Sequence, residues 1–366
     1  MDRIPLVDLS MAHAEVADEI LLGFHRVLTD TVYVGGPEVE AFEREYAAFC
    51  GMPYCVGVAN GTDALELALR ALGVGPGREV ILPANTFIAT AEAVARIGAR
   101  PVLVDCDPTS YLMDTDAALA ALTPATGAVV PVHLYGQLAP VELLSSAGVP
   151  IVEDAAQAQG ATRHGTAAGS SGIATTSFYP SKNLGAYGDA GAVVTVERAL
   201  ADAVRTMANH GSRARYRHEV VGCNSRLDAL QAVVLRTKLS RLAAWNQARQ
   251  ATAARYHELL EGVEVVRPAV LPGNDHVWHL YVVRVPPGRR AQVCARMVDA
   301  GVAVGIHYPV PVHLTPAFAH LGLRAGTFPH AEDAAAEIVS LPMHPHLTAG
   351  QQEYVVSSLV TALARG

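Results

Sequence analysis

Short apolar, β-branched runs alternate with helical stretches between residues 54 and 195. The apolar runs predict strands, and the stretches between them carry apolar residues at helical spacing. The predicted strands cover residues 54–58, 79–82, 101–105, 127–133, 150–154 and 190–195. The predicted helices cover residues 63–72, 86–97 and 116–122, with a short helix near Val141. Continuously apolar strands separated by helices predict a mainly parallel sheet with helices on both faces, an α/β fold.

The second part of the chain has a different pattern. A long helical stretch from Leu227 to about Leu260 suits a connector between two domains. It is followed by a strand, a helix, a second strand and a capping box that opens the closing helix, at residues 278–285, 295–300, 301–305 and 348–351. We therefore expect a large domain over residues 1–245 and a smaller α+β domain over residues 246–366.

Composition narrows the class of protein. Half of the 366 residues (51%) are hydrophobic, which is ample for a buried core. The formal net charge of −8 and the absence of a basic stripe argue against a nucleic-acid surface. The N-terminus lacks the apolar core of a signal peptide, and every apolar stretch is too short to span a membrane. We expect a protein without nucleic-acid or membrane partners.

Cysteine and histidine give no metal site. The five cysteines are widely scattered, and free thiols in a reducing cytosol are the simplest interpretation, so we expect a cytoplasmic protein. The 15 histidines form no helical pair, and the closest group, His344 and His346, is interrupted by proline.

Lysine is almost absent from this chain. Of 27 basic residues only Lys182 and Lys238 are lysine. A deprotonated lysine can form an imine with an aldehyde, which arginine cannot. Upstream, the predicted strand at 150–154 ends in Asp154. A lysine of this kind with an Asp that holds a pyridinium nitrogen is the signature of pyridoxal phosphate (PLP) chemistry. Taken singly, Lys182 is equally well a surface lysine and Asp154 a helix cap.

Other polar residues follow strand ends, where open α/β sheets bind ligands. Asn60–Asp63 opens a helix whose N–H groups suit a phosphate, although plain N-capping by Thr62 or Asp63 is the commoner use of such residues. The Ser177 hydroxyl is a further candidate donor to the phosphate. Phe87 begins a helix where its ring could stack on a pyridine, and a core position is the alternative.

At this point the chain resembles the DegT/DnrJ-type sugar aminotransferases, a PLP-dependent family of fold type I. The resemblance runs from Val34 almost to the C-terminus. It rests on several motifs in the family's order: residues 60–64 (NGTDA), 83–90 (PANTFIAT), 133–136 (HLYG), 153–157 (EDAAQ), 177–184 (SFYPSKNL), 188–191 (GDAG) and 224–228 (NSRLD).

The resemblance implies a seven-stranded, mainly parallel sheet and a role for each matching residue. Lys182 would carry the cofactor and move protons, and Asp154 would partner the ring nitrogen. Gln157 would lie near the ring hydroxyl. The phosphate would be held by Gly61, Thr62 and Ser177, and by Asn224 from the neighbouring subunit of a homodimer. Family members that act as dehydratases carry His in place of the lysine, so Lys182 favours an aminotransferase.

The substrate also follows from resemblance alone. Residues 216–226 and 307–313 resemble segments that line a sugar-nucleotide pocket, so Tyr216, Arg226, His307 and Tyr308 are candidate substrate residues; for each of them a structural role is the alternative. The resemblance implies transfer of an amino group from L-glutamate to a TDP-linked keto-deoxysugar, at position 3, for a natural product. A 4-keto-sugar or cyclitol aminotransferase and, more remotely, a PLP-binding regulatory protein are the alternatives.

Overall fold

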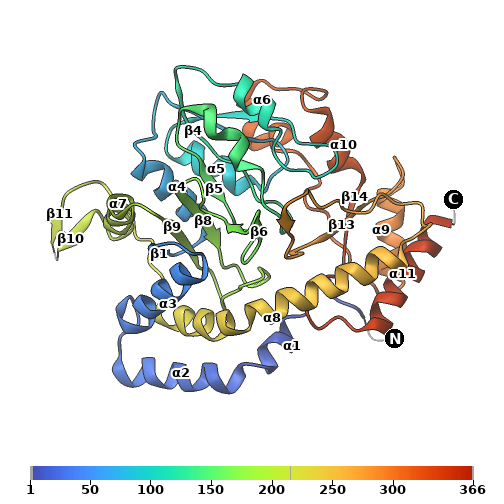
Figure 1. Ribbon diagram of the computed structural model, residues 1–366, viewed down its shortest axis with the longest axis horizontal. Coiled ribbons are helices and arrows are strands. Elements are labelled where there is room, and N and C mark those ends of the chain that lie inside the picture. Colours follow the sequence, from blue (N-terminus) through green and yellow to red (C-terminus); the bar gives the residue numbers. More distant parts are fainter. Residues whose placement is uncertain (1–2, 215, 365–366) are drawn as a thin grey trace.

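The computed structural model describes residues 3–214 and 216–364, and its centre is one twisted sheet (Figure 1). One ladder has the order β3 (Arg100–Val104), β2 (Glu79–Pro83), β4 (Thr126–Val129), and the other has the order β1 (Tyr54–Val58), β9 (Gly191–Thr195), β8 (Ile173–Ser177), β5 (Val152–Asp154). Parallel bridges from Val129 to Ile151 and from Val132 to Asp154 join β4 to β5. The result is a seven-stranded sheet in which only β9 runs antiparallel to its neighbours. The predicted α/β fold with a mainly parallel sheet is confirmed.

Helices cover both faces of this sheet, as the apolar strands require. Strand β1 shows the division: Val56 packs in the cluster that contains Leu65, whereas its neighbour Cys55 packs in the cluster that contains Phe42 and Leu235. One face is covered by α4 (Gly61–Ala71), α5 (Ile88–Arg96) and α7 (Arg198–Ala208). The other is covered by α3 (Gly36–Phe49) and the first half of α8 (Ala229–Leu259). Helix α2 (Ala17–Asp30) packs on α8.

The C-terminal part has a core of its own. Strands β13 (Tyr281–Arg284) and β14 (Ile338–Leu341) pair antiparallel, and α9 (Arg290–Asp299), α11 (Ala349–Ala364) and the second half of α8 pack around them. Ile4 belongs to the same core and pairs with Val302. Helix α8 therefore runs from one core to the other, along the lower side of Figure 1. The domain division between residues 245 and 246 falls inside this helix and stays a prediction.

Smaller elements complete the described residues: α1 (Leu9–Ala14), α6 (Thr115–Ala120), α10 (Pro329–Glu337), β6 (Thr162–Arg163), β7 (Thr166–Ala167), β10 (Ser212–Ala214), β11 (Arg217–His218), β12 (Asn274–Asp275) and the 3₁₀ turns η1 (Val141–Ala147), η2 (Val312–Leu314) and η3 (Pro316–Leu321). Strands β10 and β11 form a hairpin at the edge of the molecule (Figure 1). In the described ranges no helix combines the length and the apolar character that a bilayer span needs.

Two predicted strands of the C-terminal part differ from the structure. The strand predicted from Trp278 begins only at Tyr281, because Trp278 has a left-handed φ of 49°. The strand predicted at 301–305 is wrong: Val302 and Gly305 make isolated bridges to different partners, Ile4 and Ser340, so no ladder forms. The capping box is confirmed, because Gln351 N donates to Thr348 Oγ1 and Thr348 N donates to Gln351 Oε1.

Candidate active site

Most of the predicted site residues border one cavity of about 560 Å³. That volume lies in the range of cofactor and small-molecule sites. It opens where β5 and β8 end and where α4 and α5 begin, at the carboxyl edge of the sheet. The predicted residues that line it are Gly61, Thr62, Phe87, Asp154, Gln157, Ser177, Lys182, His307 and Tyr308.

The start of α4 forms one end of the cavity. Asn60 caps the helix by accepting a hydrogen bond from Asp63 N at 2.8 Å, so the N–H groups of Gly61 and Thr62 precede the first intrahelical donor. A Cβ on Gly61 would lie 2.6 Å from Ser177 Cβ, so only glycine lets the helix approach this serine. Backbone N–H groups, a helix N-terminus and two hydroxyls converge here, and this set fits a phosphate.

Asp154 lies at the end of β5 and is 5% exposed. Ala156 N donates to its Oδ1 at 3.2 Å, and Thr90 Oγ1 donates to its Oδ2 at 2.9 Å. Because the Thr90 proton points to the carboxylate, Thr86 must donate the 2.9 Å bond that joins the two threonines. Burial raises the pKa of Asp154, while these donors and the Lys182 ammonium oppose that rise. A cation beside this carboxylate, such as a pyridinium, would favour its ionised form.

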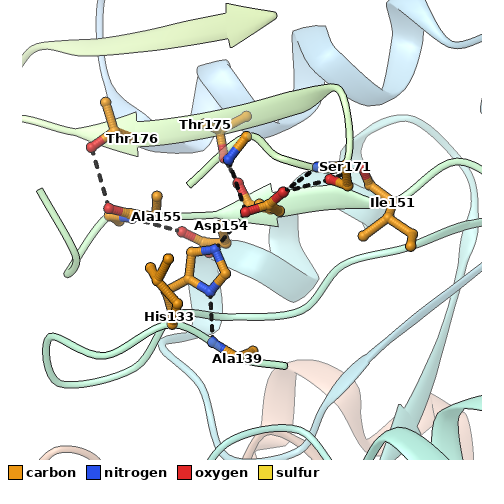
Figure 2. Close-up of polar contacts among 12 residues, drawn as sticks. His133, Ala139, Ile151, Asp154, Ala155, Ser171, Thr175 and Thr176 are labelled. Atoms are coloured by element: carbon orange, nitrogen blue, oxygen red, sulfur yellow. Dashed lines mark hydrogen bonds and ion pairs between the residues drawn. The ribbon is translucent and has the colours of Figure 1, made fainter. Parts of the chain in front are cut away.

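The adjacent carboxylate, Glu153, points away from the cavity, as strand alternation predicts. It is fully buried and accepts hydrogen bonds from His133 Nε2 at 2.8 Å, from Gly169 N at 2.8 Å and from Ser171 Oγ at 2.6 Å. Figure 2 shows two members of this network, His133 and Ser171, in the region of Asp154, with Ala139 N donating to the other ring nitrogen of His133. Burial alone would raise the pKa of Glu153, but the hydrogen bonds outweigh it and lower the pKa. Glu153 is therefore a structural anion.

The two lysines have similar pKa values and different surroundings. Burial lowers the pKa of Lys182 to about 8, against an opposing effect of Asp154, and burial lowers the pKa of Lys238 to about 8 as well. Lys182 borders the large cavity. Lys238 donates to Gly185 O at 2.7 Å. Lys238 borders a different, smaller cavity, which holds only about 20 Å³, room for about one water. Of the two, Lys182 alone has space for an aldehyde cofactor.

Gln157 and Tyr308 close the side of the cavity next to Asp154. Gln157 accepts from Tyr135 N at 2.8 Å and donates to the Tyr308 hydroxyl at 2.9 Å, which fixes its amide orientation. The ring of Phe87 is 52% exposed and lies 5.4 Å from the Tyr308 ring, so it faces the cavity rather than the core. His307 bonds Ser340 Oγ at 2.8 Å, and burial with the nearby Lys182 charge lowers its pKa to about 4. His307 is therefore neutral at pH 7.

Sequence reasoning missed Thr86, Thr90 and His279. Thr86 precedes α5 and Thr90 lies in its first turn, but nothing in the sequence shows that the two hydroxyls meet each other beside Asp154. His279 borders the cavity and bonds Asn183 Oδ1 at 3.2 Å. It lies about a hundred residues beyond Lys182, and only the folded chain brings the two together.

Three predicted residues do not line the cavity of their own chain. Asn224 forms a bridge with Asn209, and Arg226 donates to Asn209 Oδ1 at 3.1 Å. Tyr216 lies in the β10–β11 hairpin, 79% exposed. Their roles toward cofactor and substrate stay predictions, and so does the expectation that Asn224 acts from a neighbouring subunit.

Fold and site together define a class. A seven-stranded sheet with one antiparallel strand carries a phosphate-binding helix start, a buried Asp and a lysine of lowered pKa around one cavity, as in a fold-type-I PLP-dependent transferase. The sequence matches the DegT/DnrJ/EryC1/StrS aminotransferase family over residues 15–360, and the chain belongs to that family. Its cofactor is PLP.

Two relatives show how far the similarity extends. The erythromycin biosynthesis sensory transduction protein EryC1 of Saccharopolyspora erythraea is 48% identical over 97% of this chain and 98% of its own. The dTDP-3-amino-3,4,6-trideoxy-alpha-D-glucose transaminase of Streptomyces venezuelae is 45% identical over 98% of this chain and 95% of its own.

Solved structures agree with the fold and with the cofactor. The crystal structure of S. venezuelae DesV in complex with a ketimine intermediate superposes with a TM-score of 0.97, at 44% identity and over all of both chains. The structure of NtdA from Bacillus subtilis, with bound cofactor PMP, has a TM-score of 0.91 at 30% identity, covering 100% of this chain and 86% of that one.

Proposed function

We propose that this aminotransferase moves an amino group from L-glutamate to position 3 of a TDP-linked keto-deoxysugar, in the synthesis of an amino sugar for a natural product. The observation that carries the proposal is Lys182, a lysine whose pKa burial lowers to about 8, bordering the same cavity as Asp154 and the phosphate-binding end of α4. The choice of sugar and position draws on the S. venezuelae transaminase, whose name specifies a 3-amino-trideoxyglucose on dTDP.

The residues of this chain fit the cofactor in separate roles. Gly61, Thr62 and Ser177 would hold its phosphate, and Phe87 would cover one face of its ring. Asp154 would keep the ring nitrogen protonated, and Gln157 would face the ring hydroxyl. When bound, PLP supplies an aldehyde for the amino group and a ring that accepts electrons.

Lys182 is the acid and base of the proposed reaction. With a pKa of about 8, roughly one amine in ten is unprotonated at pH 7, far more than for a lysine at 10.5. The free amine can take a proton from a substrate carbon, and the resulting ammonium can return it to the carbon on the far side of the transferred nitrogen. His307 and Tyr308, both held by hydrogen bonds and both bordering the cavity, would contact the sugar.

The alternatives differ in substrate or in class. A 4-keto-sugar or cyclitol aminotransferase would use the same lysine and aspartate, and the compared transaminase favours position 3 instead. A regulatory role is suggested by the name of EryC1, which refers to sensory transduction. The presence here of Lys182, Asp154 and Gln157 around one cavity supports an enzyme.

The substrate proposal is tested by incubating the protein with L-glutamate and a matched pair of TDP-linked 3-keto and 4-keto sugars. We expect glutamate-dependent amination of the 3-keto sugar, identified by NMR of the product. Efficient conversion of the 4-keto sugar alone would overturn the proposal that the amino group is added at position 3. Cofactor binding without conversion of any keto sugar would favour the regulatory role.

We also propose that the active site is shared between the subunits of a homodimer. Asn224, Tyr216 and Arg226 lie outside their own cavity, which supports a contribution to that of a partner. Leu21 and Leu22 of α2 are 62% and 65% exposed, an apolar surface that a second copy could cover.

Subunit complementation tests the shared site. Lys182→Ala and Asn224→Asp should each be inactive, the second because its added charge repels the phosphate. In a mixed dimer one site carries both lesions and the other carries none, so about half of the mixed dimers' sites should work. Absence of recovery after verified subunit exchange would remove Asn224 from the partner's site.

A cytoplasmic location is the last part of this proposal. The five cysteines are all free in the structure, which supports a reducing compartment.

A further inference from the structure

Three polar side chains of α8 hold the segment that follows Lys182. Gln231 Oε1 accepts from Tyr187 N at 2.8 Å, Lys238 Nζ donates to Gly185 O at 2.7 Å, and Asn246 Oδ1 accepts from Asn183 Nδ2 at 2.9 Å. Their spacing of seven and eight residues equals about two helical turns, so all three share one face of α8.

Lys238 is the charged member of this set. It is 6% exposed, and its ammonium also lies 4.4 Å from the centre of the Tyr187 ring. Burying a charge is unfavourable unless it gains specific partners, and here the partners are a carbonyl and a ring face of the same segment. Tyr187 in turn bonds His13 Nδ1 at 2.5 Å. If this side chain only filled space, an apolar residue would do so without the free-energy cost of burying a charge.

The loop transmits this contact to Lys182. Lys182 N donates to Tyr179 O and Ala186 N donates to Phe178 O, both at 2.8 Å, which closes the loop on itself. Gly185 packs so tightly on Pro180 that a Cβ would lie 2.2 Å from the Pro180 oxygen. A displacement of Gly185 therefore displaces the Pro180–Lys182 turn.

We propose that Lys238 is a positioning residue, whose ammonium holds the Gly185 carbonyl and thereby sets where Lys182 stands in the cavity. The inference rests on the proposed role of Lys182 and is independent of which sugar is the substrate. It also explains why the second lysine of the chain is not arginine: the adjacent cavity of about 20 Å³ does not admit the larger guanidinium fork.

The test compares Lys238→Met with Arg241→Met in the holoenzyme. Arg241 is a cation of the same helix that pairs with Glu19 instead of the lysine loop. We expect Lys238→Met to bind PLP in full and to lower kcat about 10- to 100-fold with little change in KM, because a catalytic group is misplaced. The pH midpoint of the visible band of the bound cofactor, recorded without substrate, should also move in this variant. Arg241→Met should match the wild-type protein in both readouts.

A second variant separates position from charge. Gln231→Leu removes an anchor of the same loop without changing its charge, so it should lower kcat in the same direction by a smaller factor. It also keeps the test open if Lys238→Met does not fold. The titratable groups that border the small cavity beside Lys238, apart from Lys182, are Asp8, Arg249 and His344, and none is altered by these variants.

Wild-type kcat and midpoint in Lys238→Met, or in Gln231→Leu if Lys238→Met does not fold, would overturn the proposal. Because the midpoint needs only enzyme and cofactor, it remains decisive if the sugar substrate is assigned wrongly.

Discussion

The surroundings of Lys182 and of Lys238 differ although the two amines do not. Burial lowers both pKa values to about 8, so both amines are partly unprotonated near neutral pH. Lys182 borders a cavity of about 560 Å³ with a buried carboxylate and a helix start, whereas Lys238 is fastened to a carbonyl and a ring next to space for about one water. A lowered pKa makes a lysine nucleophilic, but space and partners decide whether it reacts.

Removing Lys182 should have the largest effect. Lys182→Ala should lower kcat/KM by at least about 10⁴-fold, since the covalent anchor and the proton-transfer group are lost together. Steady-state kinetics measures this, with Lys238→Met as the paired variant. The comparison of the two regions fails if Lys238→Met loses as much activity as Lys182→Ala.

Neutralising the cavity carboxylate should have the next largest effect. Asp154→Asn should still bind PLP and lose about 10²- to 10³-fold in kcat, the scale of one preorganised electrostatic contact. Glu153→Gln is the matched control, because Glu153 lies one residue away and points to the opposite side of β5. This variant should lower the thermal midpoint of unfolding clearly and should change kcat only slightly. If Glu153→Gln lost kcat and Asp154→Asn lost mainly thermal stability, Glu153 would be the catalytic carboxylate and Asp154 the structural one.

The hydrogen bond from Thr90 to Asp154 should contribute to catalysis. Thr90→Val removes the hydroxyl that donates to Asp154 Oδ2 while keeping the shape, and should lower kcat about 10-fold, as expected for a hydrogen bond to a charged group. Thr90→Ser should restore most of the activity, and Thr86→Val should have a smaller effect. Equal activity in Thr90→Val and Thr90→Ser would show that the hydroxyl has no role.

The smallest expected effect is on the pH dependence of the free energy of unfolding, to which Lys238 contributes. Its pKa falls from 10.5 in the unfolded chain to about 8 in the folded protein, so between these values the unfolded state binds more protons. The free energy of unfolding therefore rises with pH in that window, by up to roughly 3 kcal/mol from this group. Lys238→Met should lack this part of the rise in urea titrations at pH 7.5 and 10. If the free energy of unfolding rose equally with pH in the wild-type protein and in Lys238→Met, the lowered pKa of Lys238 would be contradicted.

The local part of this picture could be predicted from the sequence, and the long-range part could not. The buried parallel strands are recognisable because they are continuously apolar, and Lys182 because lysine is so rare. Thr90 and Lys238 act through partners 64 and 53 residues away, and no local pattern encodes such pairings. The strand predicted at 301–305 was wrong for the same reason, since its neighbours Ile4 and Ser340 come from both ends of the chain.

The most direct test of the central claim is to reduce the PLP-loaded protein with borohydride and to map the labelled peptide. With two lysines in the chain, the map has two possible sites for a lysine label. The account predicts a stoichiometric label on Lys182 and none on Lys238. A label on Lys238, or one divided between the two, would contradict the claim that access to the large cavity selects the reactive lysine.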